Sequence, residues 1–358
     1  MKKILLYIDN MLYGGANRVM ANLANHFCES EHETILVNDR PYDEECPGYA
    51  INGSVKRYYL DTGSRNMLRR TAIRLKKLRK IIKSERPDVV LSFMAGPNTR
   101  MLMSTIGLPA KKVVSVRNDP YKEYGSGIKR IFANSLFKLA DGVVFQTDEA
   151  AEYFSEGIQA KSKVIFNPVN MKFYEKQWHP GGHNIVVVGR LQSQKNPLLV
   201  LRAFAKIANS LSGITLDYVG EGKLKAELQD SAVKFGVSDR VHFLGKREDI
   251  DSILEQACIY VLCSDFEGMP NALMEAMTVG IPVISTNCPC GGPRALIKER
   301  IQGILVPCGD VDALASEMER LINDKSYQVD MSVAERKRSE DFRPDRILAE
   351  WDSFLFTD

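Results

Sequence analysis

The sequence has no long apolar run and no leader-like opening. None of its apolar stretches approaches the roughly 20 residues that a membrane-spanning helix needs, so no such helix is predicted. The opening MKKILLYID loses its apolar character at Asp9 and Asn10, which favours a buried first strand over a signal peptide. Hydrophobic residues make up 44% and charged residues 26% of the 358 residues, proportions that are typical of a soluble globular protein.

Paired cysteines are also lacking. The seven cysteines are odd in number and show no C-x-x-C spacing; they are Cys28, Cys46, Cys258, Cys263, Cys288, Cys290 and Cys308. This pattern predicts reduced thiols, a cytoplasmic location and no structural zinc.

Charge is divided unevenly between the two halves of the chain. The net charge is +3, but residues 1–168 carry 26 Lys and Arg against 18 Asp and Glu, whereas the remainder carries 22 against 27. Most of the basic excess lies within 56–83, which holds 11 basic residues and the single acid Asp61. The whole chain is not strongly basic and shows no helix-turn-helix pattern, so nucleic acid is not an expected partner.

Much of this excess falls on an expected amphipathic helix over 66–84. Apolar residues recur along RNMLRRTAIRLKKLRKIIKSERP at helical spacing, among them Ile73, Leu78 and Ile82. Two interpretations stay open: a solvated surface helix, or a contact with an anionic membrane surface or a diphosphate-bearing substrate.

Short runs rich in Val, Ile and Leu alternate with helical patterns along the chain. The first half holds KILLYID, TILVN, VVLSF, KVVSV and GVVFQ, and the second holds NIVVVG, TLDYVG, VHFLG, IYVLCS, IPVIST and GILVP. The alternation indicates βα units with parallel sheets, and the nearly continuous apolar character is typical of strands covered on both faces. The fold class is therefore α/β, with doubly wound parallel sheets.

The stretch Phe166–Asn184 separates the two series of strands and has the Pro and Gly content of a linker. We expect an N-terminal Rossmann-like domain over 1–168, a linker over 169–183 and a C-terminal Rossmann-like domain over 184–342. A final helix over about 343–358 is expected to pack back on the N-terminal domain. Ligands bind outside the carboxyl ends of strands in such sheets, so two facing domains would hold a ligand between them.

The stretch EGMPNALME, from Glu267 to Glu275, places two carboxylates around a helix start. The first backbone N–H groups and the dipole make such a start an anion site. Gly268 permits close backbone approach, and Pro270 suits the first helical turn. On its own the stretch favours a plainer interpretation, in which Glu267 complements the dipole and Glu275 is solvated.

Two further strand ends carry candidate residues. Arg190 follows NIVVVG directly and Lys195 stands at the head of the next helix, so two cations converge on the strand-end region of EGMPNALME. Gly14 and Gly15 lie in a loop that opens a helix after KILLYID. That loop lacks G-x-G-x-x-G spacing, so a dinucleotide site is only weakly indicated.

Eight motifs follow one another in a recognisable order. They are GGANRV (14–19), NPV (167–169), GRLQSQKN (189–196), VGEGKLKAEL (219–228), VHFLGKREDI (241–250), DFEGMPNALMEAMTVGIPVIST (265–286), CGGPRALI (290–297) and GILVPCGDVDALA (303–315). This set resembles the family-four retaining glycosyltransferases with the GT-B fold, which build bacterial surface polysaccharides or lipid-linked oligosaccharides. In that family two Glu separated by seven residues form a signature, here Glu267 and Glu275.

The resemblance implies a donor site around that signature. The donor's phosphates would dock at the helix start, with Arg190 and Lys195 neutralising the leaving diphosphate. Glu275 would accept hydrogen bonds from the ribose hydroxyls, and Glu267 would face the donor sugar near its reacting carbon. The catalytic set is thus Glu267, Arg190 and Lys195. The donor-binding set consists of Glu275 together with Gly15, Gly189, Gly220, Gly222, Lys246, Arg247, Gly268, Met269, Pro270 and Asn271.

The acceptor side departs from the family pattern. Many members carry a His or Glu after a late strand of the N-terminal domain, whereas here the sequence is SVRND, Ser115–Asp119, and no His lies between His32 and His179. We assign the acceptor site to four residues, Gly14, Asn17, Arg117 and Asn118. A structural ion pair is the alternative for Arg117.

Two Asp-x-Asp triplets, 249–251 and 310–312, could suggest a metal site. Both precede helical runs, where Asp249 and Asp310 are explained as N-cap residues. Enzymes of the family generally need no metal, because cationic side chains and the helix dipole neutralise the diphosphate in its place. We therefore expect neither a metal nor a cofactor.

The expected activity is transfer, with retention, of a hexose or N-acetylhexosamine from a nucleotide diphosphate sugar, with UDP as the expected nucleotide. The expected acceptor is a saccharide linked to polyprenyl diphosphate, at the inner face of the cell membrane. Two alternatives stay open. A sugar-nucleotide epimerase of GT-B architecture would convert the donor without an acceptor, and a sugar-nucleotide-binding regulator would not catalyse transfer.

Overall fold

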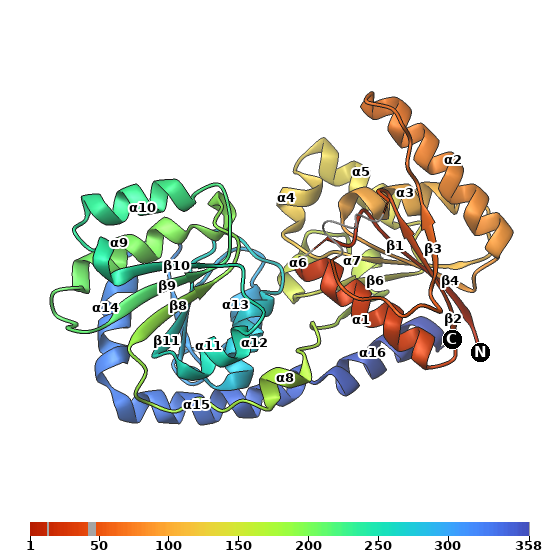
Figure 1. Ribbon diagram of the computed structural model, residues 1–358. Coiled ribbons are helices and arrows are strands. Elements are labelled where there is room, and N and C mark those ends of the chain that lie inside the picture. Colours follow the sequence, from red (N-terminus) through yellow and green to blue (C-terminus); the bar gives the residue numbers. More distant parts are fainter. Residues whose placement is uncertain (13, 42–47, 358) are drawn as a thin grey trace. The chain divides into compact units, whose positions relative to one another are not determined.

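The computed structural model describes residues 1–12, 14–41 and 48–357, so Cys46 lies outside the described residues. The chain divides into two compact units. Unit 1 comprises Met1–Asn167 together with Ile347–Asp358, and unit 2 comprises Pro168–Arg346. Each unit contains one parallel sheet with helices on both faces (Figure 1).

The sheet of unit 1 has the strand order β3-β2-β1-β4-β5-β6-β7. Its strands are β1 (Lys3–Ile8), β2 (Glu33–Asn38), β3 (Lys56–Tyr59), β4 (Val89–Phe93), β5 (Lys111–Ser115), β6 (Gly142–Phe145) and β7 (Ser162–Val164). The register places Leu5 of β1 opposite Ile35 of β2 and Val90 of β4. The helices are α1 (Gly15–Glu29), α2 (Met67–Glu85), α3 (Ala95–Ser104), α4 (Pro120–Tyr124), α5 (Ile128–Phe137), α6 (Asp148–Glu152), α7 (Glu156–Gln159) and α16 (Pro344–Phe356).

The last helix of the chain belongs to the core of unit 1. Ile347, Trp351 and Leu355 of α16 are buried in the same cluster as apolar residues of β1, α1 and β4. The Trp351 ring lies 5.7 Å from the ring of Phe93. The chain therefore returns to unit 1 after unit 2 is complete.

The sheet of unit 2 has the order β10-β9-β8-β11-β12-β13. Its strands are β8 (Asn184–Val188), β9 (Thr215–Val219), β10 (Val241–Gly245), β11 (Ile259–Leu262), β12 (Val283–Thr286) and β13 (Ile304–Val306). Its helices are α8 (Met171–Tyr174), α9 (Pro197–Ile207), α10 (Lys225–Lys234), α11 (Ile250–Gln256), α12 (Asn271–Val279), α13 (Gly292–Leu296), α14 (Val311–Asn323) and α15 (Lys325–Ser339), with short 3₁₀ turns at Ser193–Lys195, Ser238–Arg240 and Glu340–Phe342.

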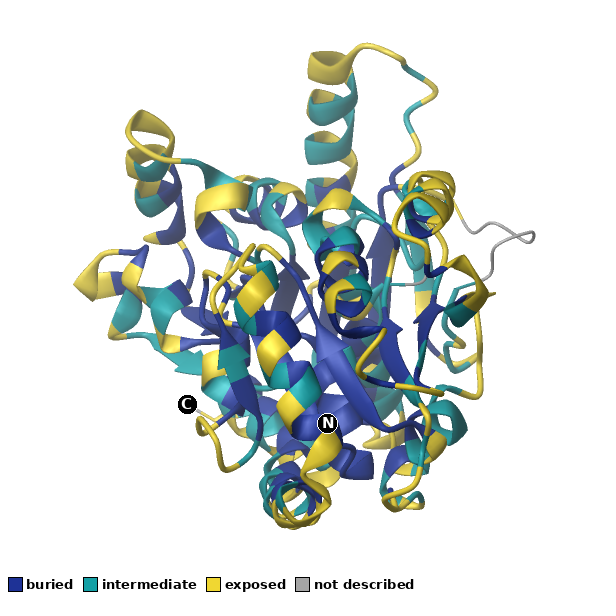
Figure 2. Ribbon diagram, turned by 90° about the vertical axis from the view of Figure 1, so that its left-hand side faces the viewer, coloured by how far each residue is buried: buried dark blue, intermediate teal, exposed yellow. Residues whose placement is uncertain are grey.

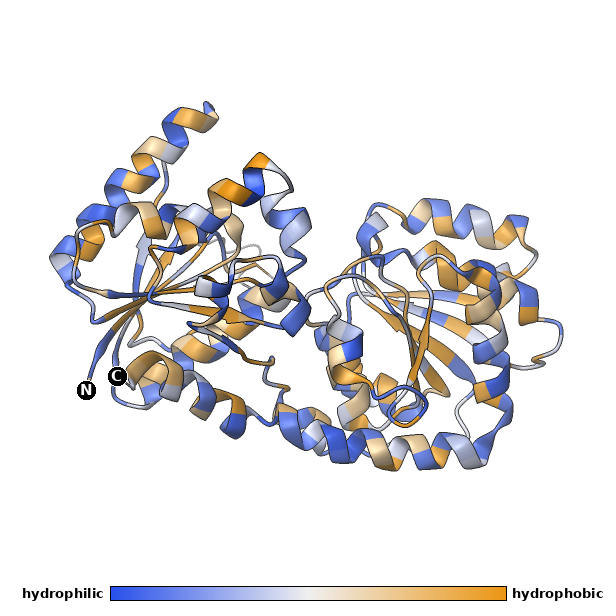
Figure 3. Cartoon of the chain, turned by 180° about the vertical axis from the view of Figure 1, so that it is seen from behind, coloured by the Kyte–Doolittle hydropathy of each residue, from blue (hydrophilic) through white to orange (hydrophobic). Residues whose placement is uncertain are grey.

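The apolar runs of the sequence lie where the strand prediction placed them. The strands of both sheets are largely hydrophobic, whereas the surrounding helices alternate hydrophobic and hydrophilic residues (Figure 3). Most strands are correspondingly buried, and the helices expose one side (Figure 2). Two strands were not predicted, β3 and β7, because their sequences KRYY and SKV are short and largely polar.

The basic helix over 66–84 corresponds to α2, which Asn66 caps by accepting a hydrogen bond from the backbone N–H of Arg69. Only Leu78 and Ile82 of this helix are buried, so its N-terminal half packs little against unit 1. Figure 1 shows this end of α2 standing clear of its unit. Within the described part of the chain, no helix is both long and apolar enough to cross a bilayer.

Candidate active site

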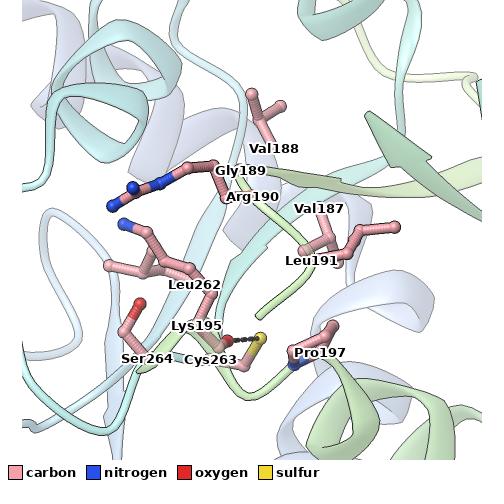
Figure 4. Close-up of a pocket in the computed structure, with 10 residues that line it drawn as sticks. All are labelled: Val187, Val188, Gly189, Arg190, Leu191, Lys195, Pro197, Leu262, Cys263 and Ser264. Atoms are coloured by element: carbon pink, nitrogen blue, oxygen red, sulfur yellow. Dashed lines mark hydrogen bonds between the residues drawn. The ribbon is translucent and has the colours of Figure 1, made fainter. Parts of the chain in front are cut away.

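The candidate active site lies at the carboxyl ends of β8, β9 and β11 in unit 2. The strand order of this sheet reverses between β8 and β11, because β9 follows β8 on one side and β11 lies on the other. Open α/β sheets bind ligands at this reversal, outside the carboxyl ends of the strands. A small pocket lies there, lined by Val187, Val188, Gly189, Arg190, Leu191, Lys195, Pro197, Leu262, Cys263 and Ser264 (Figure 4).

Two cations enter this pocket from the segment after β8. Arg190 is exposed, and Lys195 ends the short 3₁₀ turn before α9. In Figure 4 both side chains direct their charged ends toward the same side of the pocket. The turn is held to the β11 end by two contacts: the Cys263 thiol donates to the Lys195 carbonyl at 3.0 Å, and the backbone N–H of Asp265 donates to the Gln194 carbonyl at 2.9 Å.

Glu267 is the partner of Lys195. The Lys195 ammonium donates to Oε1 of Glu267, and the Ser264 hydroxyl donates to the same oxygen at 2.6 Å. Glu267 is only 7% exposed, and these two hydrogen bonds compensate the loss of water around its carboxylate. The sequence analysis did not select Ser264, although its position directly after the apolar run of β11 was a usable signal.

Glu275 lies on α12 and is 3% exposed. Its burial contradicts the plainer interpretation of a solvated helix residue, because a buried carboxylate is costly unless it is paired or hydrogen-bonded. The helix begins at Asn271 with Pro270 at its N-cap, one position earlier than the first-turn position that the sequence suggested for Pro270. Gly268 and Met269 lead into this start and are buried.

Glycines bring the strand-end loops close to one another. A side chain on Gly220, whose φ is +143°, would place its Cβ 2.0 Å from the carbonyl oxygen of Gly189. At Gly222 a Cβ would lie 2.2 Å from the carbonyl oxygen of Leu191. Gly292 is a third such position, because a Cβ there would lie 1.8 Å from the carbonyl oxygen of Gly268. Gly292 belongs to the CGGPRALI motif, but the sequence analysis did not count it as a site residue.

The remaining donor-binding candidates lie after β10 and at the start of α1. Lys246 and Arg247 are exposed after β10, and Arg247 pairs with Asp249 through contacts of 2.8 and 2.5 Å. Asp249 occupies the N-cap position of α11 as predicted, but its side chain makes no capping hydrogen bond to the helix. The N-cap explanation is confirmed for Asp310, which accepts a hydrogen bond from the backbone N–H of Ala313 at 2.9 Å. Gly15 lies in unit 1, as the first residue of α1.

The cysteines of this region are not nucleophiles. Burial raises the pKa of the Cys263 thiol to about 12. Burial, followed by the charge of Glu267, also raises the pKa of Cys288. Both thiols are therefore neutral at physiological pH, and a thiolate is the reactive form. Among the residues that the structure describes, no group of three or more His, Cys, Asp or Glu side chains could hold a metal ion.

The acceptor candidates all lie in unit 1. Gly14 precedes α1, and the Asn17 amide donates to Oδ1 of Asn10 at 3.0 Å and to the Leu12 carbonyl at 2.7 Å. Arg117 is 7% exposed. Asn118, next to it, is half-buried.

Buried groups surround Arg117. Its guanidinium lies over the Phe93 ring, 4.6 Å from the centroid, and donates to Oδ1 of Asn167. Burial lowers the pKa of Arg117 to about 9, which still leaves it charged at neutral pH. Burial raises the pKa of Glu123 to about 7, against the attraction of the nearby Arg117 charge. These surroundings favour a structural role for Arg117.

Comparisons with known proteins identify the family of this chain. Residues 13–173 match the family model described as "Glycosyltransferase Family 4", and residues 172–338 match the one described as "Glycosyl transferases group 1". The chain is a GT-B glycosyltransferase of the family-four type. The resemblance inferred from the eight motifs is thereby confirmed.

Relatives of this glycosyltransferase are found in several bacteria. One relative is the Campylobacter jejuni GalNAc-alpha-(1->4)-GalNAc-alpha-(1->3)-diNAcBac-PP-undecaprenol alpha-1,4-N-acetyl-D-galactosaminyltransferase. The two sequences are 28% identical, over 98% of this chain and 97% of the relative. This chain is also 34% identical, over 40% of its length and 37% of the relative's, to the Escherichia coli UDP-Gal:alpha-D-GlcNAc-diphosphoundecaprenol alpha-1,3-galactosyltransferase. Both names describe transferases that act on lipid-linked sugars.

Solved structures confirm the GT-B fold. The Anabaena protein Alr3699/HepE, crystallised with UDP and glucose, superposes with a TM-score of 0.82 over the full length of both chains at 17% identity. A sucrose-phosphate synthase from Thermosynechococcus elongatus gives 0.84 over 99% of this chain and 98% of that one, at 16% identity. At these identities the likeness concerns the fold alone.

Proposed function

We propose that this glycosyltransferase moves a hexose or N-acetylhexosamine, with retention of configuration, from a UDP-sugar to a saccharide carried on polyprenyl diphosphate. The support is the Campylobacter jejuni relative, which aligns over nearly the whole of both chains and whose name specifies an undecaprenol-diphosphate acceptor. The Escherichia coli relative's name specifies UDP-Gal as donor. The work would take place in the cytoplasm at the inner face of the cell membrane, in surface glycan synthesis.

In this proposal unit 2 binds the donor. The diphosphate lies at the start of α12, where backbone N–H groups and the dipole favour an anion. Arg190 and Lys195 reach the same region and stabilise the leaving diphosphate. Glu275 accepts hydrogen bonds from the ribose hydroxyls. The remaining donor-binding candidates, Gly15, Gly189, Lys246 and Arg247 among them, complete the donor's surroundings.

The Lys195–Glu267 ion pair gives this donor site two arrangements. Without donor, the Lys195 ammonium neutralises Glu267. A bound diphosphate offers the ammonium a more strongly charged partner, while Ser264 continues to hold Glu267 through its 2.6 Å hydrogen bond. Glu267 is then oriented toward the donor sugar, where it stabilises positive charge at the reacting carbon as the leaving group departs.

Transfer with retention then depends on positioning and charge stabilisation rather than on a nucleophilic side chain. The acceptor hydroxyl attacks the reacting carbon on the face from which the diphosphate leaves, and the departing phosphate oxygen takes the hydroxyl proton. Arg190 and Lys195 supply the positive charge that a divalent metal supplies in other transferases, so no metal is needed. On unit 1, Gly14, Asn17 and Asn118 are the proposed acceptor contacts, with Arg117 as support behind Asn118.

The basic helix α2 is proposed to meet the anionic surface that carries such an acceptor. Each basic residue near an anionic membrane contributes about 1 kcal/mol to binding. The run over 56–83 holds 11 basic residues against one acid. This attraction would concentrate the enzyme where a polyprenyl-diphosphate acceptor resides.

The test is transfer by the purified protein. A panel of labelled nucleotide sugars is incubated with undecaprenyl-diphosphate-linked saccharides, and the label is followed into the lipid phase. We expect one UDP-sugar to transfer, and the anomeric configuration of the product, measured by NMR, to match that of the donor. Inverted product would contradict retention. Conversion of the donor without any acceptor would indicate an epimerase, and donor binding without turnover would indicate a regulator.

A further inference from the structure

Helix α5 of unit 1 has two apolar faces, and only one of them is covered. Ala133, Leu136 and Phe137 form the buried face. Phe137 stacks on Phe154 with ring centroids 4.6 Å apart. On the other face Ile128, Ile131 and Phe132 are 85%, 67% and 60% exposed. A helix that is apolar on both sides normally has both sides covered.

The exposed face is contiguous and held in place. Residues three and four apart are neighbours on a helix surface, so Ile128, Ile131 and Phe132 form one patch. The helix cannot easily turn this patch inward, because Arg130 donates to the Tyr153 carbonyl at 2.7 Å and lies over the Tyr153 ring. Isolated exposed apolar residues are common on proteins, whereas a fixed apolar cluster marks an interaction surface.

A second exposed apolar pair lies at a corresponding position on α2. Met67 and Leu68, in the first turn, are 74% and 78% exposed. Helices in a parallel α/β sheet begin at the carboxyl edge of the strands, so α2 and α5 begin at the same edge. Helix α3 packs against both of them. Figure 1 shows both helices on the same side of unit 1.

Basic residues surround these apolar side chains. Residues 120–139 contain four Lys and Arg and one acid, and both Lys129 on α5 and Lys138 at its C-cap are exposed. Residues 56–83 around α2 add 11 basic residues against a single acid. Exposed apolar side chains within a basic surface are complementary to an anionic lipid interface, where the chains enter the apolar layer and the cations meet the headgroups. A second copy of this surface would instead bring like charges together.

We propose that Ile128, Ile131 and Phe132 of α5, assisted by Met67 and Leu68 of α2, insert into the interface of an anionic phospholipid bilayer. This inference rests on the proposed function, because it gives the enzyme a fixed docking position on the membrane that holds its lipid-linked acceptor. It adds an apolar attachment to the electrostatic attraction of α2. The attachment is therefore expected to persist at salt concentrations that screen surface charges.

The experiment is flotation of the full chain with vesicles of equal parts phosphatidylglycerol and phosphatidylcholine. The triple variant Ile128→Ser, Ile131→Ser, Phe132→Ser is compared with wild type and with the control Val233→Ser, which changes a 68% exposed valine of α10 in unit 2. We expect the triple variant to lose about 100-fold in partitioning, since three large apolar side chains no longer enter the lipid. The control should bind like wild type, and both should keep part of their binding at about 1 M salt.

A fluorescence variant locates the insertion directly. The two native tryptophans, Trp178 and Trp351, are buried, so Phe132→Trp adds an exposed reporter. Its emission should shift to shorter wavelength on these vesicles and be quenched by brominated lipid. A variant that keeps apolar character, Ile131→Leu with Phe132→Leu, should retain binding. An unchanged emission, or a triple variant that floats like wild type, would overturn the proposal.

Two further measurements separate this proposal from its alternatives. If the wild type is a dimer in solution and the triple variant a monomer, the patch is covered by a second copy, and the proposal is wrong. Transfer to a short-chain, water-soluble diphosphate-linked acceptor should be equal in wild type and the triple variant. Absence of transfer in wild type would instead contradict the proposed function, while vesicle binding would still report on the patch.

Discussion

The two units share a strand order but differ at the carboxyl edge of the sheet. Strands β3-β2-β1-β4-β5-β6 correspond in order to β10-β9-β8-β11-β12-β13. The residues that directly follow β8 and β9 are Gly189 and Gly220, whereas Asp9 and Asp39 follow the corresponding strands β1 and β2. Unit 2 thus has no side chains at two positions where unit 1 has carboxylates.

Unit 1 fills that edge with an ion network. Asp39 is 4% exposed and contacts Arg100 at 2.5 Å and Arg74 at 3.2 Å, while the Tyr7 hydroxyl donates to it at 2.7 Å. These contacts tie α2 and α3 to the sheet. In unit 2 the loops after β8 and β9 instead approach each other through Gly189 and Gly220, and the Lys195 side chain lies beside Gly189. The comparison shows that the strand order determines at which edge of the sheet a ligand can bind. The residues that follow each strand determine whether side chains occupy that edge.

The largest expected effect on turnover is at Lys195, which lies at the carboxyl edge of the sheet of unit 2. Lys195→Ala removes the ammonium that pairs with Glu267 and is proposed to stabilise the leaving diphosphate. We expect turnover to fall about 1,000-fold, because such charge stabilisation is a large part of catalysis. Single-turnover transfer of labelled sugar measures it. The control Lys206→Ala removes an exposed lysine of α9 that pairs with Asp312.

Excess chelator provides the complementary test of the leaving-group assignment. Transfer by the wild type should continue when divalent ions are removed, because Lys195 and Arg190 are proposed to neutralise the diphosphate. Activity that disappears in chelator and returns with added divalent ion would assign this role to a metal. Near-normal turnover in Lys195→Ala would contradict the role of the lysine independently.

The second effect separates the two buried carboxylates of unit 2. Glu267→Ala should lower turnover by about 100-fold with a small change in KM, because its proposed contact strengthens in the transition state. Glu275→Ala should chiefly raise KM for the donor, by about tenfold, because it removes the proposed acceptor of hydrogen bonds from the ribose hydroxyls. Steady-state kinetics with varied donor distinguish them. Equal effects of both changes on turnover would contradict the proposal that Glu267 acts in the transition state and Glu275 in donor binding.

A third, smaller effect concerns the basic exterior of unit 1. Arg69→Ser with Arg70→Ser removes two charges near the start of α2 without touching Arg74, which is tied to Asp39. Binding to anionic vesicles at low salt should weaken about 30-fold, at about 1 kcal/mol for each charge. The matched control is Lys223→Ser with Lys234→Ser, the same charge change on the exterior of unit 2. If both pairs weaken binding equally, net charge rather than α2 governs attraction.

The sequence predicted every central strand and both edge strands of unit 2, but neither edge strand of unit 1. Central strands of a parallel sheet are covered on both faces, so their apolar runs are visible in the sequence. The unpredicted β3 and β7 each pair with one neighbour at an edge of unit 1, where Lys56 and Arg57 can face solvent. The segment expected to be only a linker likewise contains α8 and the buried Trp178, whose indole donates to the Ala257 carbonyl at 2.7 Å.

The candidate site was predictable where its residues lie close in sequence and follow apolar runs. Glu267 and Glu275 flank one helix start, and Arg190 and Lys195 follow one strand. Contacts between distant segments could not be predicted from the sequence. The Lys195–Glu267 pair joins residues 72 positions apart, and the Arg117–Asn167 contact joins residues 50 positions apart. Such pairings depend on how the strands align, which residue types alone do not specify.

The smallest effect concerns Glu123, a half-buried acid of unit 1 with one buried carboxylate oxygen. Its pKa is raised from 4.5 to about 7, first by burial and further by Asp119, and it is lowered in part by Arg117. A carboxyl group with a higher pKa in the folded state binds its proton more tightly there than in the unfolded chain. Unfolding therefore releases a proton between pH 4.5 and 7, and stability contributed by this group falls as pH rises through that window.

Glu123→Gln keeps the shape of the side chain and removes its titration. We expect the variant to match wild type in thermal unfolding near pH 4.5 and to unfold several degrees higher than wild type above pH 7, since this pKa difference corresponds to roughly 3 kcal/mol. Calorimetry across this pH range measures the difference. The control is Glu156→Gln, an exposed acid at the start of α7 in the same unit, which should show no such divergence. Parallel pH profiles for wild type and Glu123→Gln would mean that the attraction of Arg117 offsets the cost of burial and keeps this carboxylate charged in the folded protein.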